Sequence, residues 1–228
     1  MHTGPAIERY CQRNWLSLQK KHTMLGDMPR ILSYVMMAGP WRGVPSANMP
    51  LEDLQKVLAF KFIPGLHLLE YVHRKSPGAM ALAGAIHGDT KGREKIGEDI
   101  KETNKPENLN SLPPTLCIQA QMPDQSLTVL HNLAQITGVS LKKYVAGKTR
   151  KSDLLMPAEN QDPIGIDRYP HITSFLAENR AHVPLPLFLF GLDNVPSVFR
   201  DPQRVAVGKA AAFIKEGYKV LEKKKTDK

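Results

Sequence analysis

The feature that most constrains the fold is a strand pattern that runs directly into a helix, within residues 115–138. Thr115–Gln121 alternates apolar and polar side chains, which is typical of a β-strand with one buried face. Asp124 follows Pro123 at a position suited to capping a helix, and Gly138 stands where a left-handed residue ends one. This unit predicts an α/β fold, because such a strand and helix bury their apolar sides against each other.

Further elements on both sides of this unit extend the predicted domain. In chain order they are a charged helix over 91–103, a strand over 139–145, a short helix over 172–178, a strand over 185–190 and a helix opening at Asp201-Pro202. The core-facing side of the last helix is expected to comprise Val207, Ala210, Ala211, Ile214, Tyr218 and Leu221. Residues 91–228 are therefore predicted to form a layered sheet-and-helix α/β domain with a basic C-terminal tail.

Residues 1–90 have a different pattern, in which Gly-Pro and Pro-Gly pairs break the chain into short segments. Helices are expected over 7–21, from Pro50 to about residue 60, and over 66–73. We predict a mostly helical, irregular and basic N-terminal extension. Its first 50 residues hold six Lys and Arg but only two acids, which is typical both of an organelle-import sequence and of a basic arm on RNA. The sequence leaves these two alternatives open.

The charge of the chain favours an anionic partner. Its formal net charge is +9 and its pI is about 9.5, which is the first indication of nucleic-acid binding. Two cysteines without a paired motif indicate a reducing compartment. The apolar stretches fall short of the ~18 residues that a membrane span needs, so we expect no membrane span.

Motifs for nucleotide, metal and acid–base chemistry are incomplete. The stretch Ala146-Gly147-Lys148-Thr149 resembles the end of a phosphate-binding loop, but Lys142 stands where that motif needs its first glycine. The histidines lack the spacing of metal ligands. We therefore expect no cofactor, no metal and no catalytic residues, and we predict that the protein is not an enzyme.

The segment Leu133–Ser140 supports two interpretations. Its Ala, Gly and Val spacing resembles the first half of a helix-turn-helix, whose second helix would begin near Ser140. A helix that ends at Gly138 before a strand over 139–145 explains the same residues without a DNA-binding motif. We favour the strand.

A basic run is the best candidate for a functional site. Five cations fall within ten residues with no acid among them, and a glycine in the run lets the backbone approach a phosphate chain. Such residues neutralise phosphates with little base preference. Tyr144 and Tyr169 are candidates for stacking on unpaired bases. The predicted RNA-binding residues are Lys142, Lys143, Lys148, Arg150 and Lys151.

From about Lys91 onward, the order of elements resembles the ribosomal stalk-base protein family of the large subunit. The resemblance rests on the alternating strand Leu116–Gln121, the basic stretch Gly138–Val145, the apolar run Leu187–Phe190 and the helix opening at Asp201-Pro202. It implies rRNA binding by a divergent organellar member of that family.

The leading hypothesis is a non-enzymatic structural protein of an organellar ribosome, located in the mitochondrial matrix. Its expected partners are rRNA and neighbouring ribosomal proteins. Two alternatives remain: an accessory subunit of an organellar membrane complex, and a small-molecule enzyme with a site at the strand ends of the α/β domain.

Overall fold

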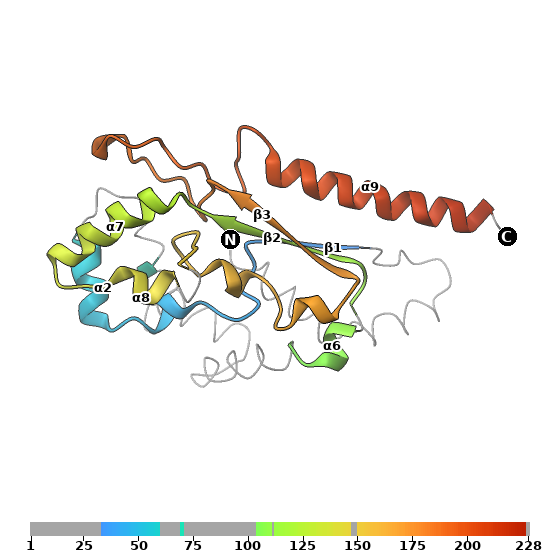
Figure 1. The fold of residues 1–228 in the computed structure, drawn as a ribbon, viewed down its shortest axis with the longest axis horizontal. Coiled ribbons are helices and arrows are strands. Elements are labelled where there is room, and N and C mark those ends of the chain that lie inside the picture. The colour runs from blue at the N-terminus through green and yellow to red at the C-terminus, as the bar shows by residue number, and fades with distance from the viewer. Residues whose placement is uncertain (1–32, 60–68, 71–103, 111, 147–149, 227–228) are drawn as a thin grey trace.

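The centre of the fold is a parallel three-stranded sheet. A computed structural model describes residues 33–59, 69–70, 104–110, 112–146 and 150–226. The strands lie in the order β1 (Tyr34–Met37), β2 (Thr115–Gln121) and β3 (Ile172–Glu178). Figure 1 shows α9 (Val205–Thr226) above the sheet, and α2 (Leu51–Leu58), α7 (Asp124–Ile136) and α8 (Leu141–Val145) beyond the end where β2 and β3 finish. The α/β class predicted from the sequence is confirmed.

Short helical segments connect these elements. They are the α-helix α6 (Pro106–Asn110) and the 3-10 turns η1 (Pro45–Asn48), η3 (Ala158–Gln161), η4 (Ile166–Arg168) and η5 (Phe188–Phe190). No helix within the described ranges is both long and apolar enough to cross a bilayer.

The strand-to-helix unit forms as predicted, with one correction. β2 has the predicted bounds, α7 follows it, and Gly138 takes the left-handed conformation with φ +81°. Asp124, however, is the first residue of α7, and no side chain caps the helix. Its carboxylate lies in the first turn, where a negative charge is favoured by the positive end of the helix.

Three predicted elements are wrong. The expected strand over 139–145 is instead α8, since Leu141 and Val145, four residues apart, are both fully buried on one helical face. The expected helix over 172–178 is β3, because pairing with β2 along its whole length outweighs local preference. The run over 185–190 forms one isolated bridge and a 3-10 turn, since the prolines there cannot donate to a sheet.

Part of the expected N-terminal extension belongs to the same sheet and core. β1 pairs with β2 in parallel, and α2, which matches its prediction, packs Leu54 and Val57 into the cluster that holds Leu130 of α7. The expected helices over 7–21 and 91–103, most of 66–73 and the proposed boundary near residue 90 lie outside the described residues.

The buried side of α9 is only partly the predicted one. Ala210, from the predicted side, packs against the sheet with Ala206 and Phe213, whereas Val207, Ile214 and Tyr218 from that side are exposed. Ala206 and Ala210 lie one turn apart and so share the face of the helix that the sheet covers. The helix also begins later than predicted, after an Asp201 carboxylate that accepts the Val205 N–H at 2.8 Å.

A side-chain amide completes the hydrogen bonding of β2 where β1 stops. Ala38 is the last residue beside β1 to bond the β2 backbone, through its N–H to Ile118 O. Beyond it, Ala120 donates its N–H to Gln161 Oε1 at 2.7 Å, and Gln161 Nε2 donates to Ala120 O at 3.1 Å. Gln161 is buried, so its amide takes the place of a neighbouring strand residue.

A buried carboxyl lies against the face of the sheet that α9 does not cover. Asp162 accepts hydrogen bonds from Gln119 Nε2 of β2 and, at 2.9 Å, from Ser174 Oγ of β3. Burial raises the pKa of Asp162 to about 6, although these hydrogen bonds and Arg42 act in the opposite direction. Compared with the unfolded chain, the folded state therefore binds the proton of this carboxyl more tightly.

We expect Asp162→Asn to stabilise the protein at neutral pH. Because the folded pKa of about 6 lies above the usual 3.8 of an aspartate, the wild type loses stability as pH rises from about 4 to 7, whereas the variant with the neutral amide does not. The difference in unfolding free energy between variant and wild type should widen by about 2 kcal/mol over that range. Urea unfolding at pH 4 and pH 7 measures it, and a difference that does not change with pH would contradict the assignment.

Candidate nucleic-acid interface

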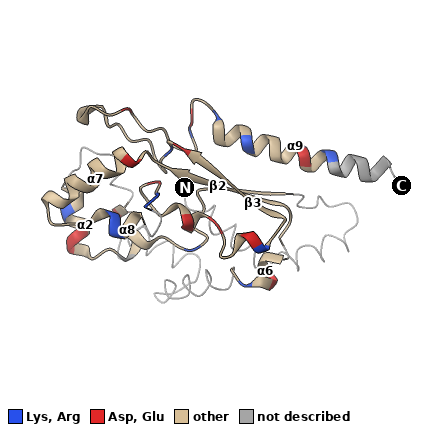
Figure 2. Ribbon diagram, in the orientation of Figure 1, with Lys and Arg blue, Asp and Glu red and all other residues tan. Residues whose placement is uncertain are grey.

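Helix α8 positions the first two cations of the basic run. Its Leu141 and Val145 are fully buried in the main apolar cluster. Lys143 lies between them and is exposed, and Lys142 is half-buried. Figure 2 shows the positive charge of α8 on the side of the molecule turned to the viewer. The core thus fixes the backbone that carries these two side chains.

Helix α7 supports Lys142 from the neighbouring side. The Lys142 backbone N–H donates to His131 Nδ1 at 3.4 Å, and Lys142 Nζ donates to Thr128 Oγ1 at 3.3 Å. Burial lowers the pKa of His131, and the charge of Lys142 lowers it further. The imidazole is therefore neutral at pH 7, which agrees with its role as an acceptor through Nδ1.

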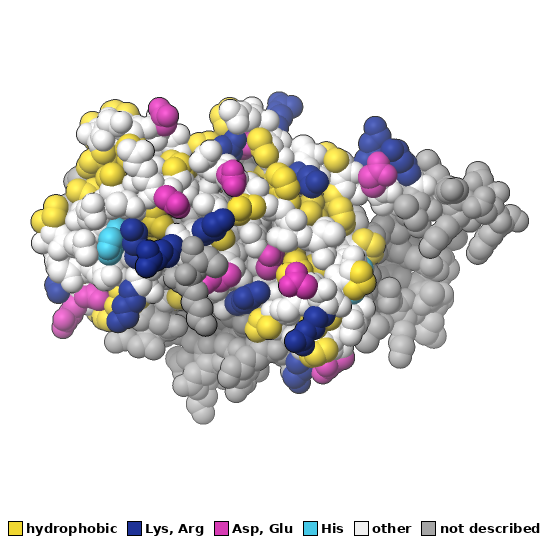
Figure 3. Space-filling model, viewed as in Figure 1, with side chains coloured by type: hydrophobic (Ala, Val, Ile, Leu, Met, Phe, Trp, Pro, Cys, Tyr) yellow, Lys and Arg dark blue, Asp and Glu magenta, His cyan; other side chains and the backbone are white. Residues whose placement is uncertain are grey.

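The remaining cations follow α8. Arg150 and Lys151 are exposed, and Arg150 has a left-handed backbone with φ +57°. The segment is tied to the end of β2, since Met122 donates its N–H to Ser152 O at 2.8 Å. Lys148 lies outside the described residues. We call Lys142, Lys143, Arg150 and Lys151 the basic surface. Figure 3 shows Lys and Arg side chains gathered beside a histidine over this part of the molecule.

The two tyrosines expected to stack on bases are engaged in the fold. The Tyr144 hydroxyl donates to Asp53 Oδ2 at 2.8 Å, and its ring packs against the main apolar cluster. Burial and then Asp53 raise the pKa of Tyr144. Tyr169 is buried in a second cluster. The prediction that Tyr169 stacks on RNA is therefore wrong, and the hydroxyl of Tyr144 is already occupied.

The α7–α8 pair has the order of a helix-turn-helix but not its dimensions. α8 begins at Leu141, close to the start expected for a second helix, after the left-handed Gly138. It has five residues, which is about 7.5 Å of helix. Such a helix is too short to present several side chains along a groove. The short α8 is better suited to contacts with a phosphate backbone than to reading bases in a groove.

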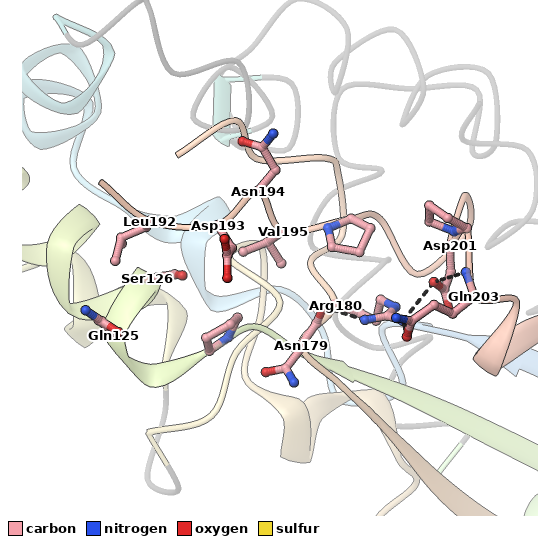
Figure 4. Close-up of a pocket in the computed structure, with 13 residues that line it drawn as sticks. Gln125, Ser126, Asn179, Arg180, Leu192, Asp193, Asn194, Val195, Asp201 and Gln203 are labelled. Atoms are coloured by element: carbon pink, nitrogen blue, oxygen red, sulfur yellow. Dashed lines mark hydrogen bonds and ion pairs between the residues drawn. The ribbon is translucent and has the colours of Figure 1, made fainter. Parts of the chain in front are cut away.

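A pocket of about 500 Å³ with both polar and apolar lining lies at the carboxyl ends of β2 and β3 (Figure 4). This is the edge of a parallel sheet where ligands commonly bind. Its walls are formed by the first turn of α7, by the residues just after β3, and by the segments 192–196 and 201–203. The lining residues are Pro123, Gln125, Ser126, Asn179, Arg180, Leu192, Asp193, Asn194, Val195, Pro196, Asp201, Pro202 and Gln203.

The buried charges of this pocket neutralise each other. Arg180 Nη2 lies 2.8 Å from Asp201 Oδ1 and donates to Gln203 Oε1 at 2.9 Å. Burial tends to raise the pKa of Asp201, but the bonds from Arg180 and from the Val205 and Gln203 N–H groups outweigh it and lower that pKa. The pair fixes the approach to α9, and the Asp201 carboxylate is already engaged by Arg180 and by the N–H groups of Gln203 and Val205.

The structure brings together a histidine and a carboxylate that the sequence did not link. His182 Nδ1 lies 2.8 Å from Asp153 Oδ2. Asp153 Oδ1 accepts the N–H groups of Leu155 and Met156, so this carboxylate holds a tight loop. In the part of the chain that the structure describes, no group of three or more His, Cys, Asp or Glu is arranged to hold a metal ion.

No known family model, curated protein or solved structure matches this chain. The case for its function therefore rests on its own residues.

Proposed function

We propose that this protein is a non-enzymatic structural component of an organellar ribosome, which contacts rRNA phosphates through the basic surface. Lys148 completes the set of contacts, and neighbouring ribosomal proteins are the further partners. The mitochondrial matrix is the proposed compartment.

One observation carries this proposal: four of the five predicted cations, Lys142, Lys143, Arg150 and Lys151, are exposed or half-buried on α8 and just after it. Buried Leu141 and Val145 anchor α8, and Lys142 is supported by α7. Arg150 and Lys151 are exposed after α8. A net charge of +9 gives the whole molecule long-range attraction to a polyanion.

The pocket at the strand ends is the observation that favours the enzyme alternative. It is concave and has polar as well as apolar lining, but its buried pair, Arg180 and Asp201, is already neutralised by a 2.8 Å contact. A catalytic acid or base needs a proton that it can gain or release near its working pH. The basic surface therefore supports the stronger proposal.

Sedimentation of organelle lysates tests the assembly that we propose. The tagged full chain should sediment with the large ribosomal subunit and move to the top of the gradient after ribonuclease treatment. An RNA-bound subunit behaves in this way because its attachment depends on intact rRNA. Sedimentation with a membrane complex that persists after ribonuclease would favour the accessory-subunit alternative and contradict the proposal.

A further inference from the structure

The basic surface has two possible classes of RNA ligand, which demand different side chains. Unpaired bases are bound by stacking on exposed aromatic rings, each worth about 1–3 kcal/mol. A double-stranded helix hides its bases and presents phosphates and ribose hydroxyls. The side chains beside the cations therefore indicate which class is bound.

Tyr144 is poorly placed to stack on a base. Its hydroxyl is bound to Asp53 at 2.8 Å, and its ring packs against the apolar cluster under α8. Lys143 Nζ lies 5.7 Å from the ring centroid, within the range of a cation–π contact. A base could cover this ring only by displacing the lysine that is proposed to bind phosphate.

His131 is also engaged. Its Nδ1 accepts the Lys142 N–H at 3.4 Å, and the ring, which α7 carries, is half-buried. Tyr169, the other aromatic expected to stack, belongs to the interior. The described side chains of this surface thus offer cations and hydrogen-bonding groups rather than open rings.

The cations stand on a fixed backbone. α8 is anchored by two fully buried residues, Leu141 and Val145, and the segment after it is tied to β2 through Ser152. Fixed cations fit a ligand whose phosphates are themselves fixed in space, because little ordering is then required on either side. A duplex meets this condition and a flexible single strand does not.

Charge density favours the same ligand. When the logarithm of the binding constant is plotted against the logarithm of the salt concentration, each phosphate contact contributes a slope of about −0.9 for a DNA duplex and about −0.7 for a single strand. We use the duplex value for double-stranded RNA. With about five contacts, the two slopes differ by about one. If the protein binds the two RNAs equally at 1 M salt, it therefore binds the duplex about tenfold more tightly at 0.1 M salt.

From these observations we propose that the basic surface binds the phosphate backbone of double-stranded RNA, without reading its bases. This inference rests on the proposed RNA-binding function and narrows its ligand. The short α8 agrees with it, because five residues give too little length for reading bases in a groove.

The test compares one 20-nucleotide RNA strand of low self-structure with the same strand paired to its complement, at 0.1 M salt. Fluorescence anisotropy with the full chain should show about tenfold tighter binding of the duplex. Tyr144→Phe keeps the ring and Tyr144→Leu removes it. Both variants should leave both affinities within about twofold of the wild type, because the ring does not contact the ligand.

The outcomes separate this inference from the function beneath it. Equal or tighter binding of the single strand contradicts the inference, as does a loss of single-strand binding in Tyr144→Leu that Tyr144→Phe does not show. Either result leaves RNA binding itself intact. If neither RNA binds measurably, both the proposed function and the inference are wrong. Circular dichroism confirms that the variants are folded.

Discussion

Gln161→Ala is expected to lower the unfolding free energy by about 3 kcal/mol. The substitution removes the amide that bonds both the N–H and the C=O of Ala120, at 2.7 and 3.1 Å. Ala120 is fully buried, so water cannot easily replace either bond. Each unpaired buried group costs about 1–3 kcal/mol, and the lost side chain leaves a cavity as well. Urea unfolding monitored by circular dichroism measures the change.

The neighbouring residue gives a matched control. Asn160 makes one partly buried bond, from Nδ2 to Gly43 O at 3.0 Å, so Asn160→Ala should cost about 1 kcal/mol. If Gln161→Ala costs no more than Asn160→Ala, the side-chain amide does not take the place of a strand at Ala120.

Replacing the five predicted cations with alanine is expected to weaken RNA binding by at least about 100-fold at 0.1 M salt. Each cation that neutralises a phosphate releases a counterion, and this release supplies most of the affinity of a binder that does not read bases. The substituted residues are Lys142, Lys143, Lys148, Arg150 and Lys151. Dissociation constants for the 20-base-pair duplex measure the effect.

A second variant with the same change in net charge tests whether position matters. It replaces five other exposed cations with alanine, namely Arg168, Arg200, Lys209, Lys215 and Lys219. Its RNA affinity should fall less than about fivefold, because only the long-range attraction is reduced. Equal losses in the two variants would mean that the basic surface is not the binding site.

Local patterns predicted those parts of the fold that depend on local residues. The bounds of β2 and the left-handed Gly138 after α7 are encoded within a few neighbouring positions, and both are confirmed. The single buried face expected for β2 is wrong, because its neighbours along the sheet and the segments on both sides bury both of its faces. β3 could not be predicted in this way, because its strand state comes from pairing with β2, which lies 57 residues earlier at the Thr115–Ile172 pair. The inward face of α9 likewise depends on contacts with strands that lie far away in the sequence.

The candidate site shows the same division. The run of cations is visible in the sequence, but its support is not: His131 is 11 residues from Lys142, and Asp53 is 91 residues from Tyr144. The anchoring of α8 was hidden because Leu141 and Val145 fit a strand as well as a helix. The approach of Asp153 to His182, across 29 residues, left no signal in the spacing of either residue.

The salt dependence of duplex RNA binding tests the central claim most directly. With about five phosphate contacts, the binding constant of the wild-type chain should fall about 500-fold between 50 and 200 mM salt, which corresponds to a log–log slope near −4.5. In the variant that lacks the five predicted cations, the slope should approach zero, whereas the charge-matched control should keep most of it. A wild-type slope shallower than about −1, or the same slope in all three proteins, would contradict the account.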